Sequence, residues 1–107
     1  MNYNENLGGI RIDIQTAGIE MNEFLHQRIK NMIGKLKSFL PEANWIDVYL
    51  KSSGKQSVHP RKISVRFGIP GPDLIATDAG YSWKTLLKNV EKKLIRQLNK
   101  RKAIRLK

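Results

Sequence analysis

Residues 9–40 consist of GIRIDIQTAGIEMNEFLHQRIKNMIGKLKSFL, and the spacing of their apolar side chains changes partway along. In residues 9–16 isoleucines alternate with polar side chains, which predicts a strand with one buried face. In residues 21–40 the apolar side chains follow helical spacing: Leu25, Ile29, Met32, Ile33, Leu36 and Leu40. That spacing predicts a helix with one apolar side. The change of period indicates a mixed α and β protein.

The rest of the chain adds three strands and a second helix. Residues 45–52 and 61–69 alternate as residues 9–16 do, and a shorter alternating segment covers residues 73–78. From Ser82, a suitable N-cap, helical spacing returns and continues to about residue 102. The predicted order of elements is therefore β-α-β-β-β-α.

The alternation of the strands also predicts how the layers pack. Because such strands keep one face in water, both helices are expected to cover the other face. We therefore predict an α+β two-layer sandwich, in which a four-stranded sheet carries two helices on one face. The 107 residues are the size of one domain, 1–107, in which residues 1–8 and 103–107 are expected to be flexible.

Positive charge is concentrated at the C-terminal end. The chain has 20 Lys and Arg against nine Asp and Glu, a formal net charge of +11. Residues 82–107 hold ten of these bases and one acid, Glu91, and so carry +9 of that charge. Solubility alone does not require this asymmetry. It favours a polyanionic partner: nucleic acid, a membrane surface or an acidic protein.

Four bases of the second helix form a row. Lys88, Lys92, Arg96 and Lys100 are spaced four apart, away from the apolar side. Each like-charged pair at this spacing destabilises an isolated helix by about 0.2–0.5 kcal/mol. Successive members rise about 6 Å along the helix axis, comparable with the separation of phosphates along a nucleic-acid strand. We interpret the row as a contact for a nucleic-acid backbone rather than as a solvated face.

Other bases are expected to extend this contact. In the first helix, Arg28 and Lys35 lie on one flank of the apolar side, and Lys30 and Lys37 lie on the other. The sequence leaves open which flank faces the second helix, and whether these bases only aid solubility. The predicted RNA-binding residues are Lys88, Lys92, Lys93, Arg96, Lys100, Arg101, Lys35, Arg28 and Lys84.

No motif for catalysis or for metal or cofactor binding occurs. The chain has two histidines, His26 and His59, no cysteine, and neither a nucleophile elbow nor a phosphate-binding glycine loop. We expect no catalytic residue, metal, cofactor or small-molecule substrate, and a protein that is not an enzyme. No apolar run approaches the ~18 residues of a membrane span, and no signal peptide is evident, so we expect a cytoplasmic protein without membrane contact.

The remaining aromatic and basic residues are expected to have structural roles. Trp45, Tyr49 and Tyr81 could stack on bases, but packing on the sheet is the simpler interpretation. Three bases are expected in solvent on the open face of the sheet: Lys51, Lys62 and Arg66.

Residues 93–102, KLIRQLNKRK, resemble the end of the second helix in the ribosome hibernation-promoting factors and the related ribosome-associated translation inhibitors. The family pattern there is close to K-L-x-R-Q-L-x-K, matched from Lys93 to Lys100. Residues 18–40 and the segment IPGPDLIATDAG, residues 69–80, also suit the family. The resemblance spans about residues 10–102.

The resemblance implies a fold similar to that of double-stranded RNA-binding domains. It also implies binding to the small ribosomal subunit and its ribosomal RNA, in the channel used by messenger and transfer RNA. Such a protein silences translation under stress or in stationary phase and promotes ribosome hibernation. Because the sequence ends at Lys107 without a second domain, it resembles the short form of the family. We expect a monomer when it is free.

Two other functions are open at this point. A free duplex-RNA-binding module would bind short duplexes as tightly as it binds ribosomes. A peripheral membrane or acidic-protein binder would expose large apolar side chains, whereas here the apolar sides of the helices are needed to cover the sheet.

Overall fold

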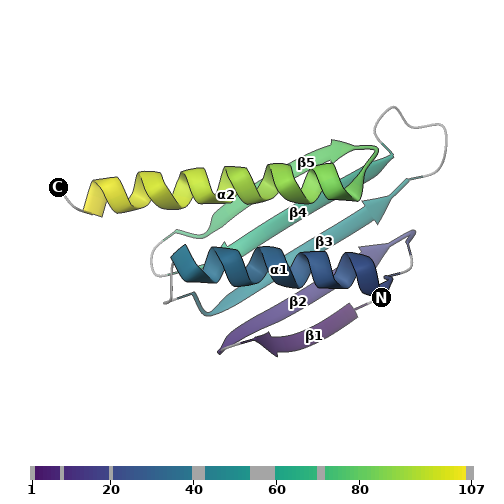
Figure 1. Ribbon diagram of the computed structural model, residues 1–107, viewed down its shortest axis with the longest axis horizontal. Helices are drawn as coiled ribbons and strands as arrows, with labels where there is room; N and C mark the ends of the chain where they lie inside the picture. Colours follow the sequence, from purple (N-terminus) through teal and green to yellow (C-terminus); the bar gives the residue numbers. More distant parts are fainter. Residues whose placement is uncertain are drawn as a thin grey trace.

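The computed structural model describes residues 2–7, 9–19, 21–39, 43–53, 60–69 and 72–105. In those residues the chain forms five strands and two helices (Figure 1). In chain order they are β1 (Asn2–Leu7), β2 (Ile10–Ala17), α1 (Glu23–Phe39), β3 (Trp45–Ser52), β4 (Arg61–Gly68), β5 (Leu74–Gly80) and α2 (Trp83–Arg105).

All five strands belong to one sheet, in the order β1-β2-β3-β4-β5. β2 and β3 are parallel and are connected through α1, whereas the other neighbouring pairs are antiparallel. Both helices lie on the same face of the sheet, and α2 contacts β4 and β5 (Figure 1). The prediction of an α+β protein with two helices on one face of a sheet is confirmed.

The core lies between the two layers. Ile14, Val48, Val65 and Ala76 are neighbours across four strands, and each is at most 3% exposed. The helices contribute their apolar sides: Leu25, Ile29, Met32, Ile33 and Leu36 from α1, and Leu86, Leu87, Val90, Leu94 and Leu98 from α2. Leu40 lies outside the described residues. Full burial of one such side chain contributes about 1.5–3 kcal/mol, so these positions fix both helices on the sheet.

The prediction of four strands is wrong, because a fifth strand, β1, pairs with β2 at the edge of the sheet. Asn4 and Asn6 are exposed, so this strand lacks the apolar alternation by which the others were recognised. Its pairing depends on the turn that follows. Gly9 has a φ of +87°, and its amide donates to Asn6 Oδ1 at 3.1 Å.

The helix ends agree with the capping prediction, and α2 is longer than expected. Ser82 Oγ accepts a hydrogen bond from the Thr85 amide at 3.5 Å, and Asn22 Oδ1 accepts one from the Leu25 amide at 2.7 Å. These caps satisfy amides that have no partner within the helix. α2 continues through Arg105, beyond the predicted end near residue 102, and residues 106–107 lie outside the described part of the chain.

On the open face of the sheet, opposite the helices, charged side chains are set close together at one end. Asp13 and Asp47 are directly opposite each other on β2 and β3. Burial and the charge of Asp13 raise the pKa of Asp47, although Arg11 and Arg66 act in the opposite direction. Because the folded state then holds this proton more tightly, ionisation of Asp47 reduces stability as the pH rises through its folded-state pKa.

Trp45 lies next to this pair and packs on the sheet, as predicted. It is opposite Gly68 in the register of β3 and β4. A Cβ atom on Gly68 would lie 2.1 Å from the indole ring, so the ring occupies the space that a larger residue would fill. The glycine is therefore required for this contact.

Candidate nucleic-acid interface

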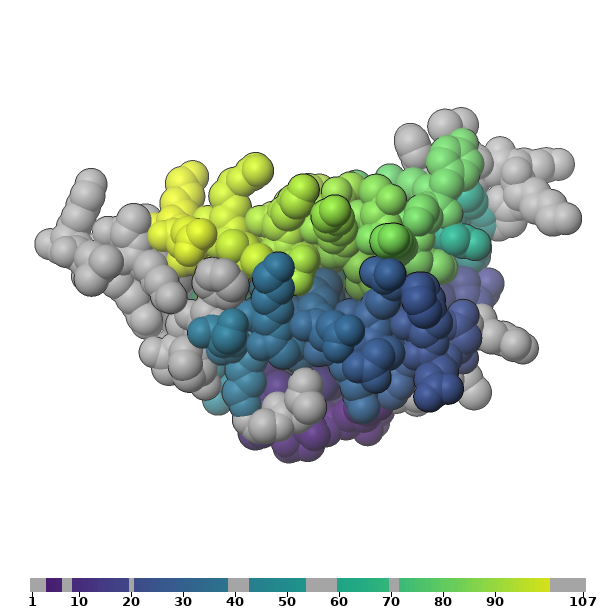
Figure 2. Space-filling view, viewed as in Figure 1, coloured from purple at the N-terminus to yellow at the C-terminus, as the bar shows by residue number. Residues whose placement is uncertain are grey.

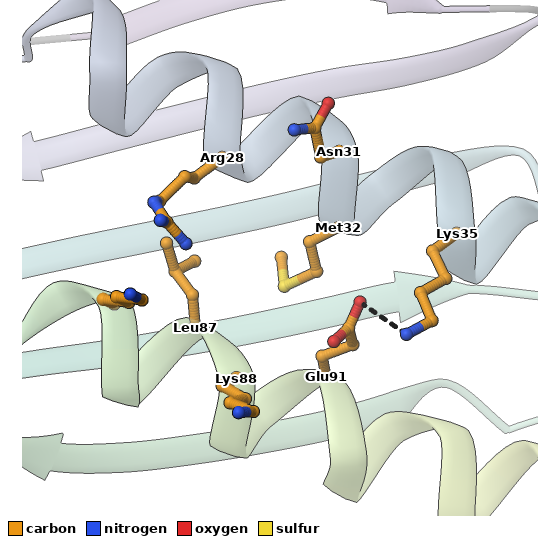
Figure 3. Close-up of a pocket in the computed structure, with 8 residues that line it drawn as sticks. Arg28, Asn31, Met32, Lys35, Leu87, Lys88 and Glu91 are labelled. Atoms are coloured by element: carbon orange, nitrogen blue, oxygen red, sulfur yellow. Dashed lines mark ion pairs between the residues drawn. The ribbon is translucent and has the colours of Figure 1, made fainter.

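A groove runs between the two helices where they lie side by side (Figure 2). It has a volume of about 340 Å³ and is open to solvent. Four residues of α1 and four of α2 line it: Arg28, Asn31, Met32, Lys35, Lys84, Leu87, Lys88 and Glu91. Figure 3 shows Met32 and Leu87 between the helices, with charged side chains around them. The groove therefore has an apolar floor and four basic groups along its sides.

The structure identifies the flank of α1 that faces α2. Arg28 and Lys35 line the groove. On the opposite flank, Lys30 Nζ forms an ion pair with Glu5 of β1 at 3.0 Å. Two of the predicted residues are therefore brought next to α2, while Lys30 is held at the β1 edge.

Glu5 forms a small cluster with two bases of α1. It is in contact with both His26 and Lys30. Burial acts to raise the pKa of Glu5, but the hydrogen bond from Lys30 and the charges of His26 and Lys30 outweigh it, so the net pKa is lowered. The ionised carboxylate thus holds β1 against α1, and this contribution is lost as the pH falls through the lowered pKa.

The α2 basic row comprises Lys88, Lys92, Arg96 and Lys100, all of which are exposed. A step of four residues advances about 40° beyond a full helical turn. The row therefore starts at the groove, where Lys88 lies, and winds obliquely over the outer surface of α2. A polyanion that followed the row would cross α2 at an angle rather than lie along its axis.

Lys93 differs from the rest of the predicted set. Its Nζ donates to the carbonyl oxygen of Thr77 on β5 at 2.7 Å. Gln97 makes a similar bond, from Nε2 to the carbonyl oxygen of Ile75 at 2.9 Å. These two side chains attach α2 to the edge strand. Lys93 therefore lies on the sheet side of the helix, and the side chain of Arg101 lies outside the described residues.

Two features of the groove are not evident from the sequence. Glu91, the acid of α2, approaches Lys35 of α1 at 3.8 Å, and its side chain is 19% exposed (Figure 3). Helical spacing places Glu91 next to the apolar side of α2, but it does not show which side chain of the other helix is opposite. The second feature is a contact within α1: Arg28 lies 4.7 Å from the centroid of the Phe24 ring, one helical turn earlier, and Phe24 is 66% exposed.

The expected absences can be examined only in the part of the chain that the structure covers. There, no group of three or more His, Asp or Glu side chains is arranged to hold a metal ion. His59 is not among the described residues. No helix in the described ranges is both long and apolar enough to cross a membrane.

Comparison with known proteins identifies a family and a fold. The family model described as sigma 54 modulation protein / S30EA ribosomal protein matches residues 12–105. The comparison with curated proteins found no match.

Solved structures that are similar to this chain include the following two. The first is a ribosomal subunit interface protein from Coxiella burnetii, with a TM-score of 0.74 and 16% identity, covering 86% of this chain and 97% of that one. The second is the N-terminal domain of Protein Y from Thermus thermophilus, with a TM-score of 0.67 and 12% identity, covering 81% of this chain and 93% of that one. These structures support the fold of ribosomal interface proteins rather than that of double-stranded RNA-binding domains, which corrects the expected likeness.

Proposed function

Since this chain belongs to the family described as sigma 54 modulation protein / S30EA ribosomal protein, which the hibernation-promoting factors share, we propose that it binds the small ribosomal subunit and silences translation. Members of this family are ribosome-associated factors and not enzymes. Our proposal adds the binding surface and the mechanism. The groove and the α2 basic row contact ribosomal RNA in the cytoplasm, and the bound domain blocks the access of messenger and transfer RNA to the subunit.

The observation that carries this proposal is the joint arrangement of the groove and the α2 basic row. Arg28, Lys35, Lys84 and Lys88 surround the groove, and the row continues from it across α2. Within the described helices, Glu91 is the one acid that lines this surface. Such a surface attracts the phosphates of RNA without reading its bases.

The position of the bound domain on the subunit is then sufficient to silence translation. The domain measures about 48 × 27 × 20 Å along its principal axes and is held together by a continuous core. A rigid body of this size excludes other macromolecules from the space it occupies. No bond needs to be made or broken, so the mechanism requires neither a catalytic group nor a cofactor.

Sedimentation with purified small subunits tests the proposal. We expect the protein to sediment with the subunits and to prevent them from binding a short messenger RNA and transfer RNA. If about six phosphates are contacted, the affinity should fall ~10³-fold between 50 and 200 mM salt. A short RNA duplex that competes as effectively as free subunits would instead favour the duplex-RNA module. Binding that does not respond to salt would contradict the electrostatic mechanism.

Replacement of Glu91 by glutamine should strengthen binding to small subunits. The carboxylate lies in the groove and repels an incoming phosphate, and it also holds Lys35 in an ion pair. Glutamine removes both effects at nearly constant volume, so we expect an affinity about three- to tenfold higher at low salt.

Measurement of Kd over a range of salt concentrations checks this expectation. Glu23→Gln is the matched control, because Glu23 is an exposed acid in the first turn of α1 and does not line the groove. An equal gain in both variants would mean that net charge alone is responsible. A loss of affinity in Glu91→Gln would show that the ion pair organises the groove for binding.

A further inference from the structure

The open face of the sheet carries a second basic and aromatic surface, which begins at Tyr49, in the row next to Asp13 and Asp47, and extends away from them to Lys51 and Lys62. Tyr49, Ser64 and Thr77 are neighbours across β3, β4 and β5, and the next row contains Lys51, Lys62 and Ala79. A shallow cavity of about 390 Å³ lies over these rows, and it is lined by all six residues together with Ile63 and Asp78. Asp78 accepts a hydrogen bond from Asn89 of α2 at 2.7 Å, so one of its oxygens is directed to the helix side. This volume falls within the range of pockets that hold small organic groups.

The ring of Tyr49 is accessible in this cavity. Tyr49 is 40% exposed, and the residues directly opposite it are Gln15 on β2 and Ser64 on β4. On the β4 side, where the cavity lies, the short side chains of Ser64 and Thr77 follow it across the sheet. Trp45, by contrast, is packed against Gly68 on the same face. Tyr49 therefore presents an aromatic surface that the sheet itself does not cover, and such surfaces are the platforms on which unpaired bases stack.

Two ammonium groups lie next to this ring. Lys51 and Lys62 are directly opposite each other on antiparallel strands. Like charges in this position are destabilising. In the described part of the chain, neither lysine forms an ion pair. Lys51 follows Tyr49 by two residues and therefore lies on the same face of β3, with its Cα atom about 6.7 Å further along the strand.

We propose that this surface is a second RNA contact, which takes an unpaired nucleotide with its base against Tyr49 and its phosphate between Lys51 and Lys62. The charges of the open face favour this placement, because Lys51 and Lys62 attract a phosphate on one side of Tyr49, whereas Asp13 and Asp47 repel it on the other side. An acidic peptide would use the two lysines but would gain little from the exposed ring.

The surface is separate from the helix groove. The helices cover one face of the sheet (Figure 1), and the alternation of β3 places Tyr49 on the other face. The domain would therefore contact two RNA segments at once, a duplex or backbone segment on the helix side and a single strand on the sheet side. This goes beyond ribosome binding through the helices, and it can be tested on its own.

The test uses binding of a fluorescent eight-nucleotide oligouridylate to the full chain. All variants are made in a background in which the α2 basic row is replaced by glutamine, so that binding through the helices is reduced. Tyr49→Ala should weaken binding roughly five- to 160-fold, as expected for loss of one stacked base. Tyr49→Phe should retain it, and Lys51→Gln with Lys62→Gln should weaken it.

Three controls make the result decisive. Ile75→Ala, which truncates an apolar side chain that is 46% exposed and does not line the cavity, should leave binding unchanged. An abasic oligonucleotide of equal length and hexaglutamate should both bind more weakly than oligouridylate. Unchanged binding in a folded Tyr49→Ala variant, or equal binding of the abasic oligonucleotide or of hexaglutamate, would overturn the proposal.

Discussion

Replacing the α2 basic row by glutamine should lower the affinity for small ribosomal subunits about 10²- to 10³-fold near 100 mM salt. Each phosphate that a protein neutralises contributes about 0.7–0.9 to the slope of log affinity against log salt, so losing four contacts should reduce that slope by about three units. The four side chains are exposed and are not part of the core, so the fold should be unaffected.

The same variant should become more stable while it binds less. The row contains three pairs of like charges four residues apart, and their removal should stabilise α2 by about 0.6–1.5 kcal/mol. Urea unfolding followed by circular dichroism measures this change. A variant that bound less because it was damaged would instead lose stability, so the two measurements together identify the cause of the lost affinity.

A matched control separates local contact from net charge. Replacing Arg11, Lys37 and Arg66 by glutamine removes three charges remote from the row and leaves the α2 row, the groove and the Glu5–Lys30 ion pair intact. We expect this control to lose no more than about tenfold in affinity through weaker long-range attraction. Equal losses in the two variants would contradict the assignment of the row as the main RNA contact.

Most of the fold could be predicted from local patterns, and the part that was missed lacked such a pattern. Strands β2, β3 and β4 have strict alternation, because one of their faces is buried under the helices. β1 is paired only on one side, and its exposed face consists of asparagines. It is positioned by its pairing with β2, and the spacing of apolar residues in a sequence does not predict such backbone hydrogen bonds.

The candidate interface was predicted as a set of charges but not as a surface. A helical wheel gives the angle of each side chain about its own axis, and Lys93 falls close to the row by that measure. Whether a side chain at that angle faces solvent or a strand depends on how the helix lies on the sheet. Here α2 lies next to β5, so Lys93 donates a hydrogen bond to the Thr77 carbonyl oxygen. The pairing of Glu91 with Lys35 likewise depends on how two helices are placed on one sheet.

Alanine at Gly18 and alanine at Gly34 should change stability in opposite directions. Gly18 follows β2 and has a φ of +73°. A Cβ atom there would lie 2.4 Å from the carbonyl oxygen of Ser52, which is backbone and cannot rotate away. The left-handed conformation costs about 1–2 kcal/mol for a residue with a side chain. The overlap adds a further ~1–3 kcal/mol, so Gly18→Ala should destabilise the protein by about 2–5 kcal/mol.

Gly34 provides the matched control, because the same substitution meets neither obstacle. It lies within α1, and a Cβ atom there would have no atom within 4 Å. Alanine loses less conformational entropy than glycine when a helix forms, so Gly34→Ala should stabilise the protein by about 1 kcal/mol. Thermal unfolding measures both changes, at roughly 4–8 °C per kcal/mol for a domain of this size. Equal shifts in Tm would contradict the close approach of the turn after β2 to the end of β3, since that contact distinguishes the two glycines.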